Sequence, residues 1–222
     1  MKLTIFDLDN TLLAGDSDYT WGEFLVGKGL VDALHYKQEN DRFYAEYQQK
    51  TLDIVEYQRF VLTPLITLSI TQLNALHNEF MLSHIAPIRL QKADALIKQH
   101  QAQGDELLVI TATNSFIAGP IVTTLGIKHL LATEPEVIDG RFTGNIVGDP
   151  CFQEGKIKRL KQWLAHTGKQ YEETTFYSDS INDAPLLEFA DVAVAVDPDD
   201  ALSALAKAKG WPIISLRGES NE

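Results

Sequence analysis

The sequence IFDLDNT, residues 5–11, sets two aspartates directly behind a short apolar run. The run that ends at Phe6 predicts a buried strand, and Asp7 and Asp9 follow it. In an extended strand, residues i and i+2 point to the same face, so both carboxylates would lie side by side next to the core. Like charges at that separation repel, and burial strengthens the repulsion. The chain therefore needs either a cation at this point or a strand that ends early enough for the two side chains to turn apart.

The composition is that of an ordinary soluble globular protein. The chain has 222 residues, of which 45% are hydrophobic and 23% charged, so one large domain, or a core with a smaller insert, is expected. The 19 Lys and Arg residues against 31 Asp and Glu residues give a net charge of -12. An acidic protein repels nucleic acid and anionic membrane, so neither is an expected partner. An anionic substrate would need a local metal ion or a well-placed lysine.

The number of cysteines and the first residues of the sequence indicate the cellular compartment to expect. Cys151 is the single cysteine, which excludes an internal disulfide and a cysteine-rich zinc site. Only six residues precede Asp7, too few for a signal peptide, and no stretch approaches the roughly 20 apolar residues of a transmembrane helix. The expectation is a cytoplasmic protein.

The chain divides into an α/β core and a helical insert. Residues 88–210 alternate short apolar runs such as LLVI (107–110) and VAVAV (192–196) with helical patterns, which predicts a doubly wound, Rossmann-like parallel sheet. Residues 15–84 show helical periodicity throughout. We therefore predict a core from residues 1–14 and 85–222, interrupted by an all-helical cap domain at 15–84.

Several local features refine this scheme. Asp139-Gly140 predicts a hairpin turn, and Gly119-Pro120 an interruption in the helix after the 107–110 strand. Ser69 or Thr71 is expected to cap a helix of the insert. The insert's aromatics are expected to form its core rather than a binding surface: Tyr36, Phe43, Tyr44 and Tyr47.

Polar side chains follow the predicted strands. In parallel sheets, functional groups gather beyond the carboxyl ends of the strands. The groups in such positions, with one lysine at a helix start, are Asp7, Asp9, Thr11, Thr111, Thr113, Asn114, Lys156, Asp179, Ser180, Asn182 and Asp183. Any one of them alone is more often a helix cap or turn residue. Four acidic groups at one sheet edge, however, suit Mg²⁺, which takes one or two carboxylates and accepts phosphate oxygens.

Other motifs can be checked against the same residues. An EF-hand loop starting at Asp7 would need Gly and Glu where Leu12 and Asp18 stand. The chain contains no P-loop, dinucleotide fingerprint or G-x-S-x-G element, and its six histidines lack metal-ligand spacing. A thiol catalyst made of Cys151 and His166 has nothing to support it.

Four ordered segments of this chain resemble the motifs of the haloacid dehalogenase superfamily. They are FDLDNT (6–11), VITATN (109–114), Gly155-Lys156 and YSDSINDAPLL (177–187). The helical insert resembles the cap of the phosphoserine-phosphatase-like branch. Two positions depart from the pattern: Ser178 stands where the family commonly has Gly, and Thr111-Ala112-Thr113 where phosphoserine phosphatases have Ser-Gly-Gly.

The resemblance implies an Mg²⁺-dependent phosphomonoesterase that works through an aspartyl-phosphate. Asp7 would be the nucleophile and Asp9 the general acid and base, while Asp7, the Asp9 backbone carbonyl and Asp179 would hold the metal. The remaining implied roles are phosphate or substrate binding by Thr111, Ala112, Lys156 and Asn182, and orientation of this set by Asp183.

The substrate is expected to be a small phosphate ester of amino-acid metabolism. At the position of Asp16 the phosphoserine phosphatases carry a Glu that reads the substrate's amino group, so Asp16 is a candidate substrate residue. Asp16 or Asp18 could equally cap the helix containing Trp21. The branch includes phosphatases of amino-alcohol phosphates, which favours histidinol phosphate over phosphoserine. Two alternatives remain: phosphotransfer to an acceptor alcohol, and a non-enzymatic, receiver-like phospho-acceptor domain.

Overall fold

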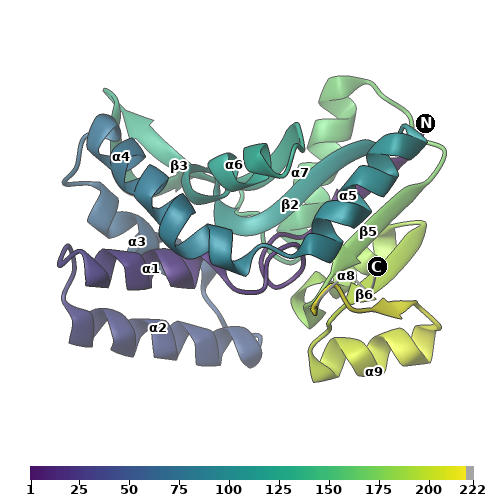
Figure 1. The fold of residues 1–222 in the computed structure, drawn as a ribbon, viewed down its shortest axis with the longest axis horizontal. Coiled ribbons are helices and arrows are strands. Elements are labelled where there is room, and N and C mark those ends of the chain that lie inside the picture. Colours follow the sequence, from purple (N-terminus) through teal and green to yellow (C-terminus); the bar gives the residue numbers. More distant parts are fainter. Residues whose placement is uncertain (219–222) are drawn as a thin grey trace.

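A seven-stranded sheet lies at the centre of the computed structural model, which describes residues 1–218. Its strand order is β4-β3-β2-β1-β5-β6-β7, and all neighbours are parallel except the antiparallel pair β3 and β4 (Figure 1). The strands are β1 (Leu3–Phe6), β2 (Glu106–Asn114), β3 (His129–Ile138), β4 (Arg141–Val147), β5 (Thr174–Ser178), β6 (Val192–Val196) and β7 (Ile213–Ile214). The predicted doubly wound parallel sheet is confirmed.

Nine α-helices are found among the described residues. Those inserted between β1 and the next core helix are α1 (Ser17–Gly27), α2 (Ala33–Gln48), α3 (Ile54–Leu62) and α4 (Ile70–Phe80). Those of the core are α5 (Gln91–Gln103), α6 (Ser115–Thr124), α7 (Glu154–Thr167), α8 (Ala184–Phe189) and α9 (Asp200–Lys209). Short helical turns at Thr63–Leu65, Met81–Ile85 and Ala86–Ile88 complete the insert. The all-helical insert is therefore confirmed, and its exact limits remain a prediction.

Alternating side chains of the strands build a core on each face of the sheet. On one face Phe6 and Val109 join residues of α5 and α6, and the same cluster continues into the insert through Trp21 and Phe80. The opposite face packs against α7, α8 and α9. Because adjacent strand residues point to opposite faces, continuous apolar runs cover both sides.

The insert is attached to the core by two adjacent segments. Leu13 and Arg89 form an antiparallel bridge, and the Ala14 amide donates to the Ile88 carbonyl at 2.8 Å. Within the insert, α2 lies close to α1 because Gly22 has no side chain: a Cβ there would stand 2.2 Å from the Tyr36 ring.

Several local predictions can be compared with the structure. Ser69 caps α4 in a capping box, and Asp139-Gly140 turns the β3–β4 hairpin with φ of 50° and 72°. The predicted interruption at Gly119-Pro120 is wrong: α6 continues through Pro120 because its buried face outweighs one lost hydrogen bond. Strand β7 has only two residues and was not expected.

The helices were also compared with membrane spans. No single helix of the described residues is long and apolar enough to span a membrane. Within residues 1–218, one bent pair of helical segments, Ile54–Leu65 and Ile70–Ile88 at 104°, reaches the required length and composition.

Candidate active site

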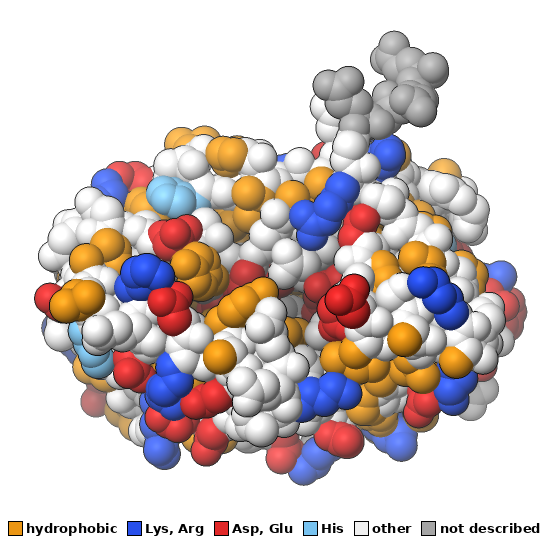
Figure 2. Space-filling model, turned by 90° about the horizontal axis from the view of Figure 1, so that it is seen from below, with side chains coloured by type: hydrophobic (Ala, Val, Ile, Leu, Met, Phe, Trp, Pro, Cys, Tyr) orange, Lys and Arg blue, Asp and Glu red, His pale blue; other side chains and the backbone are white. Residues whose placement is uncertain are grey.

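A cavity of about 500 Å³ opens at the carboxyl ends of β1, β2 and β5. Its walls combine residues that follow these strands with residues of α1, α2 and α3. Figure 2 shows the surface hollowed near its centre, with acidic side chains inside the hollow. Strand β1 lies between β2 and β5, so the site occupies the switch point where doubly wound sheets bind ligands.

Asp7 forms a buried ion pair at the floor of the cavity. The Lys156 ammonium lies 2.8 Å from Asp7 Oδ1 and 2.7 Å from the Asp183 carboxylate, and the three residues are 7%, 3% and 3% exposed. Burial raises the pKa of Asp7 to about 7, against the pull of Lys156 and with the support of Asp183 and Asp9. Burial lowers the pKa of Lys156, but its attraction to Asp183 and Asp7 outweighs this, so the lysine stays charged.

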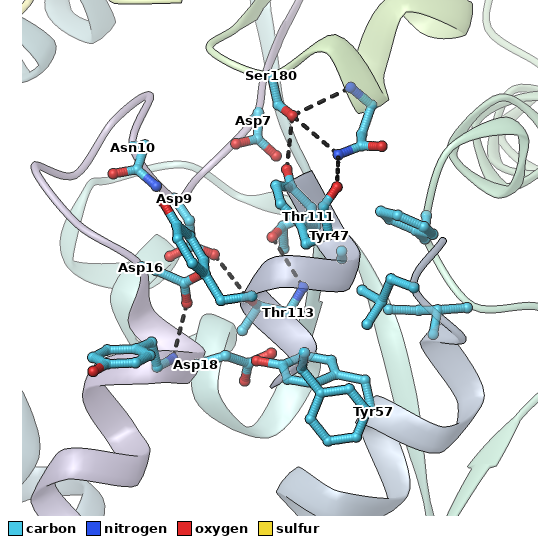
Figure 3. A pocket seen from close by; sticks show the side chains of 18 of the residues that line it. Asp7, Asp9, Asn10, Asp16, Asp18, Tyr47, Tyr57, Thr111, Thr113 and Ser180 are labelled. Atoms are coloured by element: carbon cyan, nitrogen blue, oxygen red, sulfur yellow. Dashed lines mark hydrogen bonds between the residues drawn. The ribbon is translucent and has the colours of Figure 1, made fainter. Parts of the chain in front are cut away.

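The two aspartates of residues 5–11 point apart. Strand β1 ends at Phe6, and Asn10 adopts a positive φ of 57°, which turns the chain. Asp9 Oδ1 accepts from the Ser17 amide at 2.6 Å, and Oδ2 accepts from the Thr113 hydroxyl at 2.7 Å (Figure 3). Burial, followed by repulsion from Asp16, raises the pKa of Asp9 to about 6 although these hydrogen bonds oppose the shift. Asp9 is therefore poised to exchange a proton near neutral pH.

Asp179 supplies a further carboxylate to the same cavity. It accepts from the Thr11 hydroxyl at 3.1 Å, and burial together with Asp7 and Asp183 holds its pKa well above the usual range. Mutual repulsion of this kind is relieved by a cation. No three acidic, His or Cys side chains within residues 1–218 are close enough to hold a metal unaided. Mg²⁺ commonly needs only one or two carboxylates, besides carbonyl oxygens and water, and this set fits it.

Strand β2 extends beyond the predicted strand at 107–110 and includes the predicted site residues Thr111, Ala112 and Thr113. Its register shifts between Ile110 and Asn114, which leaves residues 111–113 out of the regular ladder. The Thr113 amide donates to Thr111 Oγ1 at 3.2 Å, and the Ala112 carbonyl accepts from Gln58 of α3 and from Thr133. Thr111 and Ala112 line the cavity.

Ser178 stands where the family commonly has Gly, and its hydroxyl makes two hydrogen bonds. Its buried hydroxyl donates to Asp183 at 2.7 Å and accepts from the Ser180 amide at 3.2 Å. Ser178 therefore orients the carboxylate that holds Lys156. The departure from Gly was the signal that could have identified it.

Asp16 and Asp18 lie in different surroundings. Asp16 is exposed and caps α1, accepting from the Tyr19 amide at 2.9 Å. Asp18 is 4% exposed, and both carboxylates line the cavity. The structure thus places the capping role on Asp16.

Asn182 connects the core to the insert. Its amide group donates to the Tyr47 carbonyl at 3.4 Å, and its Oδ1 accepts from Gln153 at 3.1 Å. The Tyr47 hydroxyl in turn donates to Ser180 Oγ at 2.7 Å (Figure 3). Asn182 lies in the cavity wall, where α2 meets the loop after β5.

More aromatic side chains of the insert line the cavity than the sequence analysis predicted. Tyr36 and Phe43 are buried, as predicted for the insert's core, but Phe43 also lines the cavity together with Tyr44 and Tyr47 of α2 and Tyr57 of α3. The prediction that these aromatics form the core rather than a binding surface is therefore wrong for Tyr44 and Tyr47. Periodicity could not separate these roles, because a cavity wall and a core both require apolar surface on one helix face.

Two arginines of the insert and Cys151 lie away from the acidic residues at the floor of the cavity. Arg42 pairs with Glu39, Glu46 and Glu56. Arg59 is exposed on α3 and is absent from the cavity lining. Cys151 is fully buried, and burial raises the pKa of its thiol to about 12, which argues against a thiolate nucleophile.

Comparison with known proteins agrees with this geometry. The family model "haloacid dehalogenase-like hydrolase" matches residues 4–188. A histidinol-phosphatase of Neisseria meningitidis serogroup C (strain 8013) is 46% identical, with 97% of this chain and 99% of that protein aligned. The phosphoserine phosphatase SerB1 of Mycobacterium tuberculosis (strain ATCC 25618 / H37Rv) is 32% identical, over 96% of this chain and 70% of that protein.

Solved structures show the same fold. A protein of unknown function from Bordetella pertussis Tohama I has a TM-score of 0.92 at 42% identity, covering 97% of this chain and 99% of the other. A phospho-aspartyl intermediate analogue of phosphoserine phosphatase has a TM-score of 0.70 at 19% identity, covering 98% and 94%. The chain therefore belongs to the haloacid dehalogenase-like hydrolases and is a phosphoric monoester hydrolase of that family.

Proposed function

We propose that the protein is an Mg²⁺-dependent phosphatase of a small aminated phosphate ester, with histidinol phosphate preferred over phosphoserine. The observation that carries the preference is the charge of the cavity. Seven aspartates line it, and Lys156 is the single Lys or Arg of the described lining. Because Lys156 already holds Asp7 and Asp183, the lining offers no further cation for a substrate carboxylate. An amino alcohol lacks the carboxylate that phosphoserine carries, and the relative at 46% identity is named a histidinol-phosphatase.

The proposed reaction has two steps at Asp7 and Asp9. An Asp7 oxygen attacks phosphorus, the ester P–O bond breaks, and protonated Asp9 gives its proton to the leaving alkoxide. Asp9 then takes a proton from the water that attacks the aspartyl-phosphate, which releases inorganic phosphate and restores Asp7. The charge of Lys156 stabilises the phosphoryl oxygens, with Thr111 as a hydroxyl donor. Mg²⁺, held by the Asp7 and Asp179 carboxylates and the Asp9 carbonyl, would neutralise charge on the transferring group.

Metal removal tests the proposal. We expect EDTA to abolish phosphate release from histidinol phosphate and from p-nitrophenyl phosphate, and Mg²⁺ in excess to restore it. Comparison of kcat/KM for histidinol phosphate and phosphoserine should show the preference for the amino alcohol. Full activity in EDTA, or a preference for phosphoserine, would contradict the corresponding part of the proposal.

The two alternatives predict other products. A receiver-like switch would show no sustained turnover, and it has no need of a helical insert. A phosphotransferase would yield a new phosphate ester when an acceptor alcohol is added, which ³¹P NMR of the products would detect.

A further inference from the structure

Gln58 is a buried polar residue on the face of α3 that meets the core. Val61 and Leu62, three and four residues later on the same helix face, are buried and apolar, and Gln58 itself is 0% exposed. Its Nε2 atom donates to the Ala112 carbonyl at 3.2 Å, but its Oε1 atom has no hydrogen-bond partner among residues 1–218. A buried amide with an unsatisfied oxygen costs stability. Packing alone would therefore favour an apolar side chain at this position.

The Ala112 carbonyl does not need Gln58 in order to be satisfied. The Thr133 hydroxyl of β3 already donates to the same oxygen, at 2.9 Å. A carbonyl oxygen can accept two hydrogen bonds, and here one comes from the core and the other from the insert. Because two donors from different elements define the direction of a carbonyl more narrowly than one, the contribution of Gln58 is to orient this peptide group.

The peptide group between Ala112 and Thr113 is connected to two residues of the proposed reaction. Because a peptide group is planar, the direction of the Ala112 carbonyl also sets that of the Thr113 N–H. This N–H donates to Thr111 Oγ1 at 3.2 Å, and the Thr113 hydroxyl donates to Asp9 Oδ2 at 2.7 Å (Figure 3). Thr111 lines the cavity, and its hydroxyl donates to no group of residues 1–218. Its proton is therefore available to an oxygen of a bound phosphoryl group.

The sheet gives residues 111–113 little support of its own. Strand β2 pairs with β1 as far as Val109, and its register with β3 shifts between Ile110 and Asn114. A segment outside the regular ladder depends for its conformation on the side chains that contact it. Gln58 is such a contact, and it belongs to the insert rather than to the core.

We propose that Gln58 is a positioning residue that fixes the Ala112–Thr113 peptide, so that the insert completes the phosphoryl-binding part of the site by orienting the Thr111 hydroxyl. Gln58 is absent from the cavity lining and therefore acts through these residues of the core. The inference rests on the proposed function. It adds that the insert supports the chemical step common to all phosphate monoesters, besides any choice of substrate.

The test uses Gln58→Met, which keeps the length of the side chain but removes the donor. We expect kcat to fall about 10- to 100-fold with little change in KM, because small displacements of a positioned group have effects of this size. The loss should be the same for histidinol phosphate and p-nitrophenyl phosphate, which share the phosphoryl group alone. The melting temperature should stay at or above that of the wild type, because Thr133 still satisfies Ala112. A loss confined to one substrate, or unchanged kcat on both, would overturn the proposal.

Two further variants separate positioning from attachment of the insert. Gln58→Glu keeps the shape but places an oxygen against the Ala112 carbonyl, so kcat should fall at least as far as in Gln58→Met. His77→Phe is the matched control and should keep the wild-type kcat. His77 is 2% exposed and its Nε2 contacts the Ile117 carbonyl of α6 at 3.0 Å, another link from insert to core, and both residues are absent from the cavity lining. A smaller loss in Gln58→Glu than in Gln58→Met, or an equal loss in His77→Phe, would overturn the proposal.

A binding measurement keeps this inference distinct from the proposed reaction. Orthovanadate resembles a phosphoryl group during transfer, and calorimetry measures its affinity in the presence of Mg²⁺ without any turnover. We expect Gln58→Met to bind it at least about tenfold more weakly than the wild type does, and His77→Phe to bind it equally well. If the wild type hydrolyses no phosphate ester, the proposed function fails, whatever the vanadate affinities are. Equal affinity of the wild type and Gln58→Met, or binding by neither, would overturn the role of Gln58 even in an active enzyme.

Discussion

At the scale of single residues, Asp7 and Asp9 differ in their contacts rather than in their chemistry. Asp7 pairs with a buried lysine, whereas Asp9 accepts two hydrogen bonds from Ser17 and Thr113. The lysine favours the negative form of Asp7 and so opposes the burial that raises the pKa of this carboxyl to about 7. Asp9, whose pKa is raised to about 6 and which lacks a cation, is suited to carry a proton.

This difference predicts distinct defects in two isosteric variants. Asp7→Asn should abolish turnover while remaining folded, because the nucleophilic oxygen is lost. Asp9→Asn should slow turnover about 10²- to 10⁴-fold, the usual contribution of a general acid and base, and should still bind substrate. Rapid-quench assays with ³²P-labelled substrate measure the covalent phosphate in each. Ordinary activity of Asp7→Asn would disprove the nucleophile assignment.

At the scale of elements, the start of α7 determines where Lys156 lies. Gly155 passes so close to the Pro150 carbonyl that a Cβ would stand 2.2 Å from its oxygen. Gln153, just before the helix, has a positive φ of 47°, a conformation that side chains other than Gly rarely adopt. Gly155 therefore meets a packing requirement, and it places the neighbouring Lys156 where its proposed catalytic role needs it.

Gly155→Ala should therefore damage activity and stability together. The new methyl group must push α7 away from Pro150, which displaces Lys156 from Asp7, so we expect kcat to fall at least about tenfold and the melting temperature to drop. Gly119→Ala is the matched control, because a Cβ on α6 meets nothing within 4 Å and Ala favours a helix. Similar effects of the two substitutions would show that α7 tolerates the shift.

At the scale of the whole molecule, the acidic cavity opposes folding at neutral pH. Asp7 and Asp9 have pKa values raised to about 7 and about 6, so the folded protein holds protons that an unfolded chain releases near pH 4. A raised folded pKa means that stability is full at low pH and is lost as the pH rises through 6 to 7. The Asp179 carboxylate, with its raised pKa, adds to this loss.

The melting temperature of the metal-free protein should consequently fall between pH 5.5 and pH 7.5. Mg²⁺ should raise it more at pH 7.5 than at pH 5.5, because protons compete for the same carboxylates. Calorimetry at both pH values, with EDTA or Mg²⁺, measures the effect. Asp179→Asn should reduce both the pH dependence and the response to Mg²⁺; an unchanged response would remove Asp179 from the metal site.

Local patterns in the sequence predict the sheet, the helical insert and the polar positions after β1, β2 and β5. Those features follow from local periodicity and from the rule that parallel strands present their carboxyl ends together. Three features appear only in the folded chain: Asp16 rather than Asp18 caps α1, Ser178 orients Asp183, and aromatics of α2 line the cavity. These outcomes depend on contacts between segments far apart in the chain, where a carboxylate, a hydroxyl or a ring takes its role from the neighbours that folding brings to it.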